Sequence, residues 1–336
     1  MSTPRDLVYR TLDFDGPERV PRQLWLLPWA EMHHPDAVAR IRREFPDDIV
    51  HCPGFVANPP STSGNPYEVG EYVDEWGAVF ENKARGIIGE VKRPLVTEEE
   101  WEDADTVHIP RELLDIDVSR VNEFCRDSDR FVLAGACPRP FERLQFIRGT
   151  EQLYVDLMTR PAGLTDFMEE MHRYYTDLLT VWARTEVDAL MMMDDWGAQH
   201  ALLINPETWV ELFKPLYAEY VDIAHSNGKK IFMHSDGHIL AIYPHLVEIG
   251  VDALNSQLFC MGVENLSEYA GSITFWGEID RQHLLPNATE SEIADAVGSV
   301  KESLWKQGGC IAQCEFGAGA NPDNVYAVYK AWSTIL

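Results

Sequence analysis

The chain has 336 residues, of which 45% are hydrophobic and 25% are charged, a composition typical of a globular protein with a sizeable core. Its 55 acidic residues outnumber its 28 basic residues, which gives a net charge of -27. So acidic a surface repels phosphate backbones and anionic lipids, and this excludes nucleic acid and membranes as expected partners.

The termini and the cysteines point to the same compartment. No apolar run approaches the ~20 residues that are needed to cross a bilayer, and residues 2–16 carry charges where a signal peptide has its apolar segment. We therefore expect a cytoplasmic protein. Six cysteines are too sparse for a disulfide framework in a chain of this length, so we expect core residues, ligands or reactive thiols.

Short strands and helices alternate from the start of the chain. A strand over 22–29, a helix over 35–45 and a strand over 48–52 give a β-α-β rhythm. The segment 54–130, rich in proline, glycine and charge, then interrupts the pattern, and its length predicts an insertion that forms a lid or a pocket wall. Within it, residues 72–90 predict a hairpin that turns at 82–86.

The alternation resumes after the insertion. Further strands are predicted at 131–137, 188–195, 229–237, 251–257, 273–280 and 310–315. The helices predicted between and after them are 150–158, 161–186, 206–227, 263–269, 289–306 and 321–332. Eight strands alternating with helices favour a single (β/α)8 barrel domain over 1–336 rather than two doubly wound domains. No GxGxxG motif opens a helix after a strand, so a nucleotide site is not expected.

Polar residues gather at the ends of five consecutive predicted strands. They are Asp194 and Asp195, His234 and Asp236, Asn255 and Gln257, Glu278 and Asp280, and Cys314 and Glu315. The C-terminal ends of barrel strands meet at one mouth, where ligands bind, so this concentration predicts an active site. Adjacent strand residues face opposite ways, so only one of Asp194 and Asp195 faces a substrate, which argues against a two-carboxylate glycosidase.

Three of these residues have the chemistry of a metal site. His234 and Asp236 are two positions apart on an extended segment, so their side chains point to the same side, and Cys314 comes from the last strand. An imidazole, a carboxylate and a thiolate with an open fourth position suit a catalytic zinc. The alternative is that Cys314 is a small buried hydrophobic residue.

Several motifs resemble the uroporphyrinogen decarboxylase superfamily. They are DEWG at 74–77, MMDDWGAQ at 192–199, INPETWVELFKP at 204–215, HSDG at 234–237, FWGEID at 275–280, AQCEFG at 312–317 and NPDNV at 321–325. More narrowly, the chain resembles the methyltransferase-like branch, which includes zinc-dependent corrinoid:thiol methyltransferases. The resemblance implies a (β/α)8 barrel with its site at the mouth.

In that branch a His-x-Cys pair on one strand and a cysteine on the last strand bind zinc and activate a thiol. His234 and Cys314 match this pattern, whereas Asp236 stands where the family has cysteine, so the third ligand is either Asp236 or Glu278. Uroporphyrinogen decarboxylases resemble one another in an Arg-Gln-Ala-Gly-Arg segment. The corresponding residues from Arg22 to Trp25 lack the second arginine, which disfavours a tetrapyrrole substrate.

The leading hypothesis is therefore a zinc-dependent methyltransferase that acts on a small-molecule substrate. Its proposed roles are as follows: zinc binding by His234, Asp236 and Cys314; substrate orientation or proton relay by Asp194, Gln199 and Glu278; and substrate contacts by Trp76, Trp196, Asn255 and Gln257. The corrinoid-binding pattern Asp-x-His-x-x-Gly fails at Ala241, so a methylcorrinoid donor is expected on a separate corrinoid protein or as a free cofactor. The resemblance is also compatible with a homodimer.

Two other functions fit the same sequence. The first is a metal-independent decarboxylase or lyase of a small carboxylate or a tetrapyrrole, with Asp194 and His234 as acid and base. The second is a non-catalytic barrel that binds a partner, against which the crowded mouth argues.

Overall fold

The computed structural model describes residues 2–334 and contains an eight-stranded sheet whose neighbouring strands are all parallel. The strands are β1 (Arg22–Leu26), β2 (Ile49–His51), β6 (Phe131–Leu133), β7 (Ala189–Met193), β8 (Lys230–Ser235), β9 (Ala253–Ser256), β10 (Thr274–Gly277) and β11 (Cys310–Phe316). From β2 to β11 and on to β1, neighbours follow the order of the chain. A backbone hydrogen bond of 2.8 Å from Asp48 N to Arg22 O joins the β1 and β2 ends. The predicted (β/α)8 barrel is confirmed.

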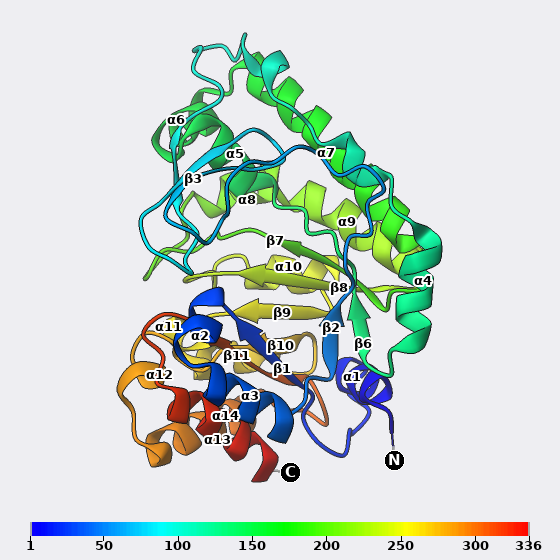
Figure 1. Cartoon of the computed structure of the whole chain (residues 1–336), viewed down its shortest axis with the longest axis vertical. Helices are drawn as coiled ribbons and strands as arrows, with labels where there is room; N and C mark the ends of the chain where they lie inside the picture. Colours follow the sequence, from blue (N-terminus) through cyan, green and yellow to red (C-terminus); the bar gives the residue numbers. More distant parts are fainter. Residues whose placement is uncertain (1, 335–336) are drawn as a thin grey trace.

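Side chains of the barrel strands alternate between two hydrophobic clusters. The inner cluster includes Phe131, Met191, Phe232, Trp276 and Ile311. Val8 and Leu12 of α1 (Pro4–Leu12) belong to it too, and α1 lies across the N-terminal ends of the strands (Figure 1). The outer cluster joins the other strand faces to the surrounding helices. Because α1 covers one end of the barrel, the opposite end is left for a binding site.

Helices surround the sheet (Figure 1). They are α2 (Pro28–His33), α3 (Pro35–Glu44), α4 (Val118–Asp127), α5 (Pro140–Arg148), α6 (Thr150–Thr159), α7 (Ala162–Ala183), α8 (Pro206–Leu212), α9 (Lys214–Ser226), α10 (Tyr243–Ile249), α11 (Leu258–Met261), α12 (Leu284–Asn287), α13 (Glu290–Leu304) and α14 (Pro322–Thr334). The single helix predicted over 206–227 is wrong, because Pro215 has no N–H to continue the ladder and α8 ends beside it. Residues 263–269 form the 3-10 segment η3 (Val263–Tyr269). None of the helices described within 2–334 combines the length and the apolar character of a membrane span.

Between β2 and β6 the chain builds a separate antiparallel sheet of β3 (Gly70–Val73), β4 (Val79–Asn82) and β5 (Glu90–Arg93), with two 3-10 segments, η1 (Ala104–Thr106) and η2 (Arg111–Leu114). The sequence predicted a hairpin with one turn, whereas the three strands are joined by two turns, of which the first was not predicted. That turn spans 74–78, where Asp74 Oδ1 accepts hydrogen bonds from Trp76 N and Ala78 N at 3.0 and 2.8 Å. Such an aspartate turn holds the loop without a glycine pair, which the strand pattern did not reveal.

Candidate active site at the barrel mouth

Five polar side chains lie on the inner face of the barrel near the C-terminal ends of the strands. They are Asp195 after β7, His234 in β8, Asn255 in β9, Glu278 after β10 and Glu315 in β11. Two positions before His234 and Glu278 stand Phe232 and Trp276 of the inner cluster. Since side chains alternate along a strand, the polar residues continue the inner face toward the mouth.

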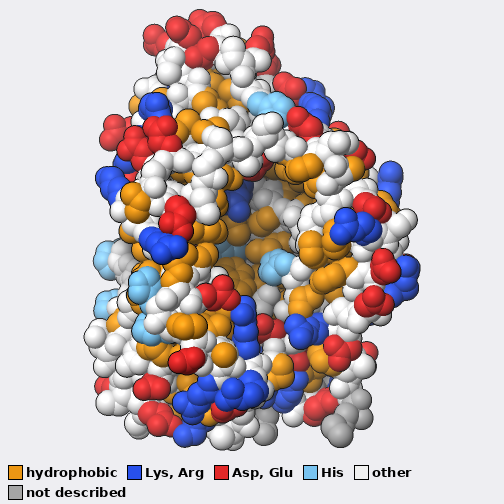
Figure 2. Space-filling view, viewed as in Figure 1, with side chains coloured by type: hydrophobic (Ala, Val, Ile, Leu, Met, Phe, Trp, Pro, Cys, Tyr) orange, Lys and Arg blue, Asp and Glu red, His pale blue; other side chains and the backbone are white. Residues whose placement is uncertain are grey.

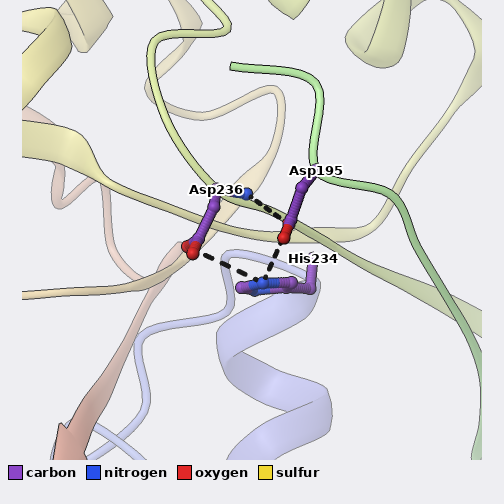
Figure 3. A group of neighbouring side chains, drawn as sticks. All are labelled: Asp195, His234 and Asp236. Carbon is purple, nitrogen blue, oxygen red and sulfur yellow. Dashed lines mark hydrogen bonds and ion pairs between the residues drawn. The ribbon is translucent and has the colours of Figure 1, made fainter. Parts of the chain in front are cut away.

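Asp195, His234 and Asp236 form a compact group, hereafter the Asp-His-Asp group (Figure 3). His234 Nε2 lies 3.5 Å from Asp195 Oδ1 and 3.7 Å from Asp236 Oδ1. Asp236 N donates a 3.0 Å hydrogen bond to Asp195 Oδ1. Asp236 Oδ1 is buried and has no hydrogen-bond partner among residues 2–334. One atom from each residue lies within 4.8 Å of the others, so the group could hold a metal ion.

Asn255 fixes the orientation of the His234 ring. Its amide nitrogen donates to the Trp276 carbonyl, so its Oδ1, 2.6 Å from His234 Nδ1, accepts the Nδ1–H. The other ring nitrogen then faces the two carboxylates, as in metal-binding histidines held by an outer partner. Burial alone would lower the pKa of His234, but the Asp195 hydrogen bond and the charges of Asp236 and Asp195 outweigh it and raise this pKa to about 9. A cation at Nε2 would have to displace that proton.

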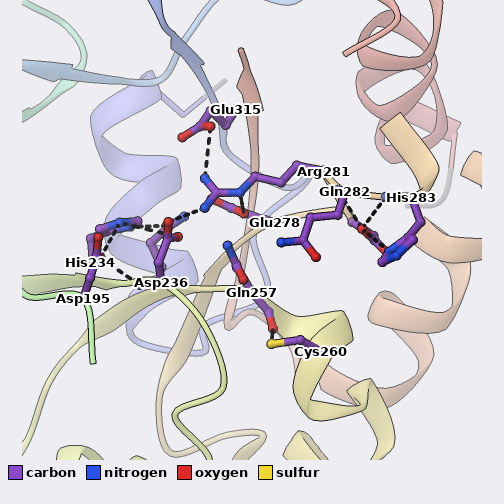
Figure 4. Close-up of polar contacts among 12 residues, drawn as sticks. Asp195, His234, Asp236, Gln257, Cys260, Glu278, Arg281, Gln282, His283 and Glu315 are labelled. Carbon is purple, nitrogen blue, oxygen red and sulfur yellow. Dashed lines mark hydrogen bonds and ion pairs between the residues drawn. The ribbon is translucent and has the colours of Figure 1, made fainter. Parts of the chain in front are cut away.

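Arg281 links the Asp-His-Asp group to further carboxylates (Figure 4). Its guanidinium binds Asp236, lies 3.0 Å from Glu315 Oε1, and places Nε 3.6 Å from Glu278 Oε2. Both carboxyl oxygens of Glu278 are buried without a hydrogen-bond partner among the described residues. Burial raises the pKa of Glu278 to about 8, against the lowering effect of Arg281, so this carboxyl carries a proton at neutral pH.

Two cavities adjoin the mouth. The first cavity, about 520 Å³, lies between the insertion and α5 and α7, and its wall includes Trp76, Arg143 and Tyr174. The second cavity, about 200 Å³, lies on the side of β9 and β10 and is bordered by Gln257 and Glu278. Figure 2 shows a hollow in the middle of the face seen in Figure 1, with hydrophobic side chains around it. Substrates thus have room on two sides of the site.

Cys314 does not join the Asp-His-Asp group, which corrects the predicted ligand set. In the β1–β11 register Cys314 stands beside Leu24 of the outer cluster, whereas Glu315 stands beside Trp25. The Trp25 ring lies 5.2 Å from that of His234, so the Trp25 face is the inner one. Cys314 therefore points to the helices, and burial raises the pKa of its thiol well above the ordinary value. It is a buried hydrophobic residue, the alternative given above.

Asp194 and Trp196 also lie outside the mouth, in contrast to their predicted roles. Asp194 is fully buried, and its carboxylate accepts hydrogen bonds from Phe141 N at 2.9 Å, Glu142 N at 2.7 Å and Tyr217 Oη at 2.5 Å. It thereby holds the first turn of α5. Trp196 is fully buried, stacks on Phe141 at 4.0 Å and donates to Tyr217 Oη. Of the acidic pair, Asp195 is the residue that faces the mouth.

The other predicted residues divide between the two cavities. Trp76 lies in the wall of the first cavity, and Gln199 and Gln257 lie in the wall of the second. Asn255 contacts His234 rather than a cavity. Sequence reasoning missed Arg281, although its position three residues after Glu278, on a loop that leaves a strand end, was a usable signal.

This chain cannot bind zinc through the cysteine thiolates that the resembled methyltransferases use. One cysteine position holds Asp236, and the other cysteine, Cys314, faces the helices. The Asp-His-Asp group does fit a divalent cation, because it offers one imidazole nitrogen, two carboxylates and the unpartnered Asp236 Oδ1.

A parallel (β/α)8 barrel with carboxylates, an imidazole and cavities at its mouth has the arrangement of a barrel enzyme. The chain belongs to the uroporphyrinogen decarboxylase family: the family model described as "Uroporphyrinogen decarboxylase (URO-D)" matches residues 78–334. This confirms the resemblance predicted from the motifs. A comparison with curated proteins found no match.

The fold is shared with a solved structure. A methyltransferase from Methanosarcina mazei is 13% identical, with a TM-score of 0.71 over 99% of each chain. A glycosylated endo-beta-1,4-xylanase from Gloeophyllum trabeum is 12% identical, with a TM-score of 0.45 over 96% of this chain and 99% of that one. At 13% identity the likeness to the methyltransferase concerns the fold alone, and no conclusion is drawn from the xylanase.

Proposed function

We propose that this chain is a metal-dependent methyltransferase that acts on a small molecule, with a divalent cation held by Asp195, His234 and Asp236. The observation that carries the metal site is the Asp-His-Asp group, whose imidazole is oriented by Asn255 and whose Asp236 Oδ1 accepts no hydrogen bond from residues 2–334. The reaction class is supported by the family and by the structural neighbour described as a methyltransferase.

The proposed ligands are harder Lewis bases than the thiolates of the resembled enzymes, because carboxylate oxygens replace cysteine sulfurs. One imidazole and two carboxylates suit zinc, and they also suit iron or manganese, which accept oxygen ligands readily. Zinc is the first metal to test, because the resemblance implies it. A cation in this position would lower the pKa of a bound thiol or hydroxyl acceptor and so supply the anionic nucleophile.

The surrounding residues of this chain would supply binding, charge and a proton. Arg281 holds Asp236 from the side opposite His234 and so fixes the orientation of that carboxylate. Glu278, protonated at neutral pH, is the acid-base group of the mouth. The aromatic wall of the first cavity, with Trp76 and Tyr174, would exclude water from the substrate. The methyl donor we propose is a corrinoid, carried by a separate protein or free.

The test starts from metal content, measured by elemental analysis of the purified protein and of Asp195→Asn, His234→Ala and Cys314→Ser. We expect near one equivalent of metal in the parent and in Cys314→Ser, and less than a tenth of an equivalent in the other two. Methyl transfer from methylcobalamin to a panel of thiols and phenols should follow metal content across the four proteins. Retention of metal by His234→Ala would refute the proposed site.

A decarboxylase is the second candidate, and a specific observation favours it. The protonated Glu278 stands near the protonated His234, and two arginines, Arg139 and Arg143, border the first cavity. A substrate carboxylate would share them with Glu142, Asp74 and Glu75. Decarboxylation by these groups would continue after chelation. Release of carbon dioxide from a carboxylate substrate by metal-free protein would therefore favour this candidate, whereas complete loss of activity on chelation, restored by zinc, would favour methyl transfer.

A further inference from the structure

The second cavity includes Glu278, a carboxyl group that is not a ligand of the proposed metal site. It is a small hollow beside β9 and β10, and its wall combines an apolar part with carboxyl and amide groups. Leu258 and Phe259 give the apolar part, and Gln257 and Glu278 contribute polar groups. Figure 4 shows Gln257, Glu278 and Arg281 side by side at this edge of the mouth. The combination of a short apolar wall and convergent polar groups is typical of a small-molecule site.

Glu278 is the polar group of this cavity whose hydrogen-bonding capacity is not satisfied by the described residues. Its side chain is 3% exposed, and neither carboxyl oxygen has a hydrogen-bond partner among the described residues. Its nearest cation, Arg281, has Nε 3.6 Å from Oε2, which is beyond hydrogen-bonding range. Buried acceptors without a donor cost free energy, so native structures normally satisfy them with a ligand, an ion or water. A ligand that donates hydrogen bonds would complete this carboxyl group.

The charge around the cavity favours a cationic donor over a neutral one. Arg281 already binds Asp236 and Glu315, so its single charge is shared among three carboxyl groups that include Glu278. Asp280, also in the cavity wall, lies 3.0 Å from His283, whose side chain is exposed. Glu278 is not a member of the Asp-His-Asp group, so a metal in that group would leave both of its oxygens free.

We propose that the second cavity binds a small primary ammonium compound, with its N–H groups donated to the two free oxygens of Glu278 and its alkyl chain against Leu258 and Phe259. An ammonium group has three donors and a compact charge, which match the two oxygens of an ionised carboxyl group in a small acidic cavity. Because Glu278 carries a proton in the free protein, binding of the ammonium ion would release that proton to solvent and leave both oxygens as acceptors. This inference goes beyond the proposed methyl transfer and does not require the cation at the Asp-His-Asp group.

The experiment is calorimetric titration of the purified, metal-loaded protein with n-propylammonium chloride, with n-propanol as the neutral ligand of equal size and with sodium chloride as the ionic-strength control. We expect saturable millimolar binding of the ammonium ion and at least tenfold weaker binding of the alcohol. Glu278→Gln, which keeps the shape and cannot ionise when the ammonium ion binds, should weaken ammonium binding at least tenfold. Asp195→Asn should lose metal and keep ammonium binding, which separates this site from the proposed metal site.

A second readout uses the parent protein alone. Cys260 borders the second cavity, so bound n-propylammonium should slow alkylation of its thiol by iodoacetamide at least threefold, followed by mass spectrometry of the labelled peptide. This readout applies even if Glu278→Gln does not fold. Equal binding of alcohol and ammonium, unchanged ammonium binding by Glu278→Gln, or absence of protection at Cys260 would overturn the proposal. Loss of a metal equivalent in Glu278→Gln would instead assign the carboxyl to a cation site, and would overturn it too.

Discussion

Adjacent residues Asp194 and Asp195 should respond in opposite ways to the same substitution. The side chain of Asp194 is fully buried and accepts three hydrogen bonds, two of them from backbone N–H groups in the first turn of α5. The side chain of Asp195 is 41% exposed and faces His234. Asp194→Asn should therefore destabilise the fold and leave metal binding intact, and Asp195→Asn should do the reverse.

The magnitude for Asp194→Asn follows from its partners. Asp194 accepts one backbone hydrogen bond on each carboxylate oxygen, whereas an asparagine has only one acceptor oxygen. The NH2 group of the asparagine would therefore face a backbone N–H, and two donors would meet. Hydrogen bonds to a charged group contribute roughly 1.5–3 kcal/mol each, and an unsatisfied buried donor costs about 1–3 kcal/mol. Burial raises the pKa of Asp194 well above its ordinary value, which reduces the advantage of the charged form. We expect a loss of about 2–4 kcal/mol.

The assays are thermal unfolding and elemental analysis on the same preparations. At about 2.1 cal/mol/K of unfolding entropy per residue, a loss of about 2–4 kcal/mol lowers the midpoint of this chain by roughly 3–6 °C. Asp195→Asn retains an oxygen that accepts the Asp236 N–H, so its midpoint should move by less than about 1 °C. Loss of metal in Asp194→Asn at an unchanged midpoint would refute the distinction between the two residues.

Three further predictions concern other groups. Arg148 of α5 and Asp156 of α6 form a buried ion pair at 2.6 Å, and Arg148 also donates to the Glu98 carbonyl of the insertion. Asp156→Ala should therefore lower the free energy of unfolding, measured with denaturant, by about 3–5 kcal/mol. The double variant with Arg148→Met and Asp156→Leu should recover part of that loss, because it leaves no unpaired buried charge. Burial raises the pKa of the Cys260 thiol to about 11, so its alkylation rate should rise tenfold per pH unit from pH 7 to 10; a plateau by pH 9 would contradict this. The folded-state pKa of Glu278, about 8, lies above the ordinary value of 4.5 that the unfolded chain has, so its contribution to stability is complete below pH 4.5 and lost as the pH rises through 8. The free energy of unfolding of the parent minus that of Glu278→Gln should therefore fall between pH 5 and 9, and a constant difference would exclude the raised pKa.

The barrel was predictable because its strands are buried on both faces. Such strands contain continuous apolar runs, as in 231–233 and 189–193, and their type does not depend on which residue faces inward. The break between α8 and α9 was missed although the sequence marked it. Pro215 lacks an N–H for a continuing helix, and it sits in the first turn of α9, where proline is favoured.

The composition of the site depends on which side chains of each strand point into the barrel. The apolar pattern of a strand that is buried on both faces does not reveal this. Cys314 and Glu315 are consecutive residues of β11, and the β1–β11 register shows that Glu315 stands beside Trp25 on the inner side. A shift of one residue would exchange them, because side chains alternate with a period of two. The same alternation separates Asp194 from Asp195. The prediction that His234 and Asp236 point to the same side followed from alternation within one segment, with Phe232 of the inner cluster two positions before His234, and needed no knowledge of a neighbouring strand. Reasoning from spacing within a strand is therefore secure at this mouth, whereas pairing ligands across strands requires the register.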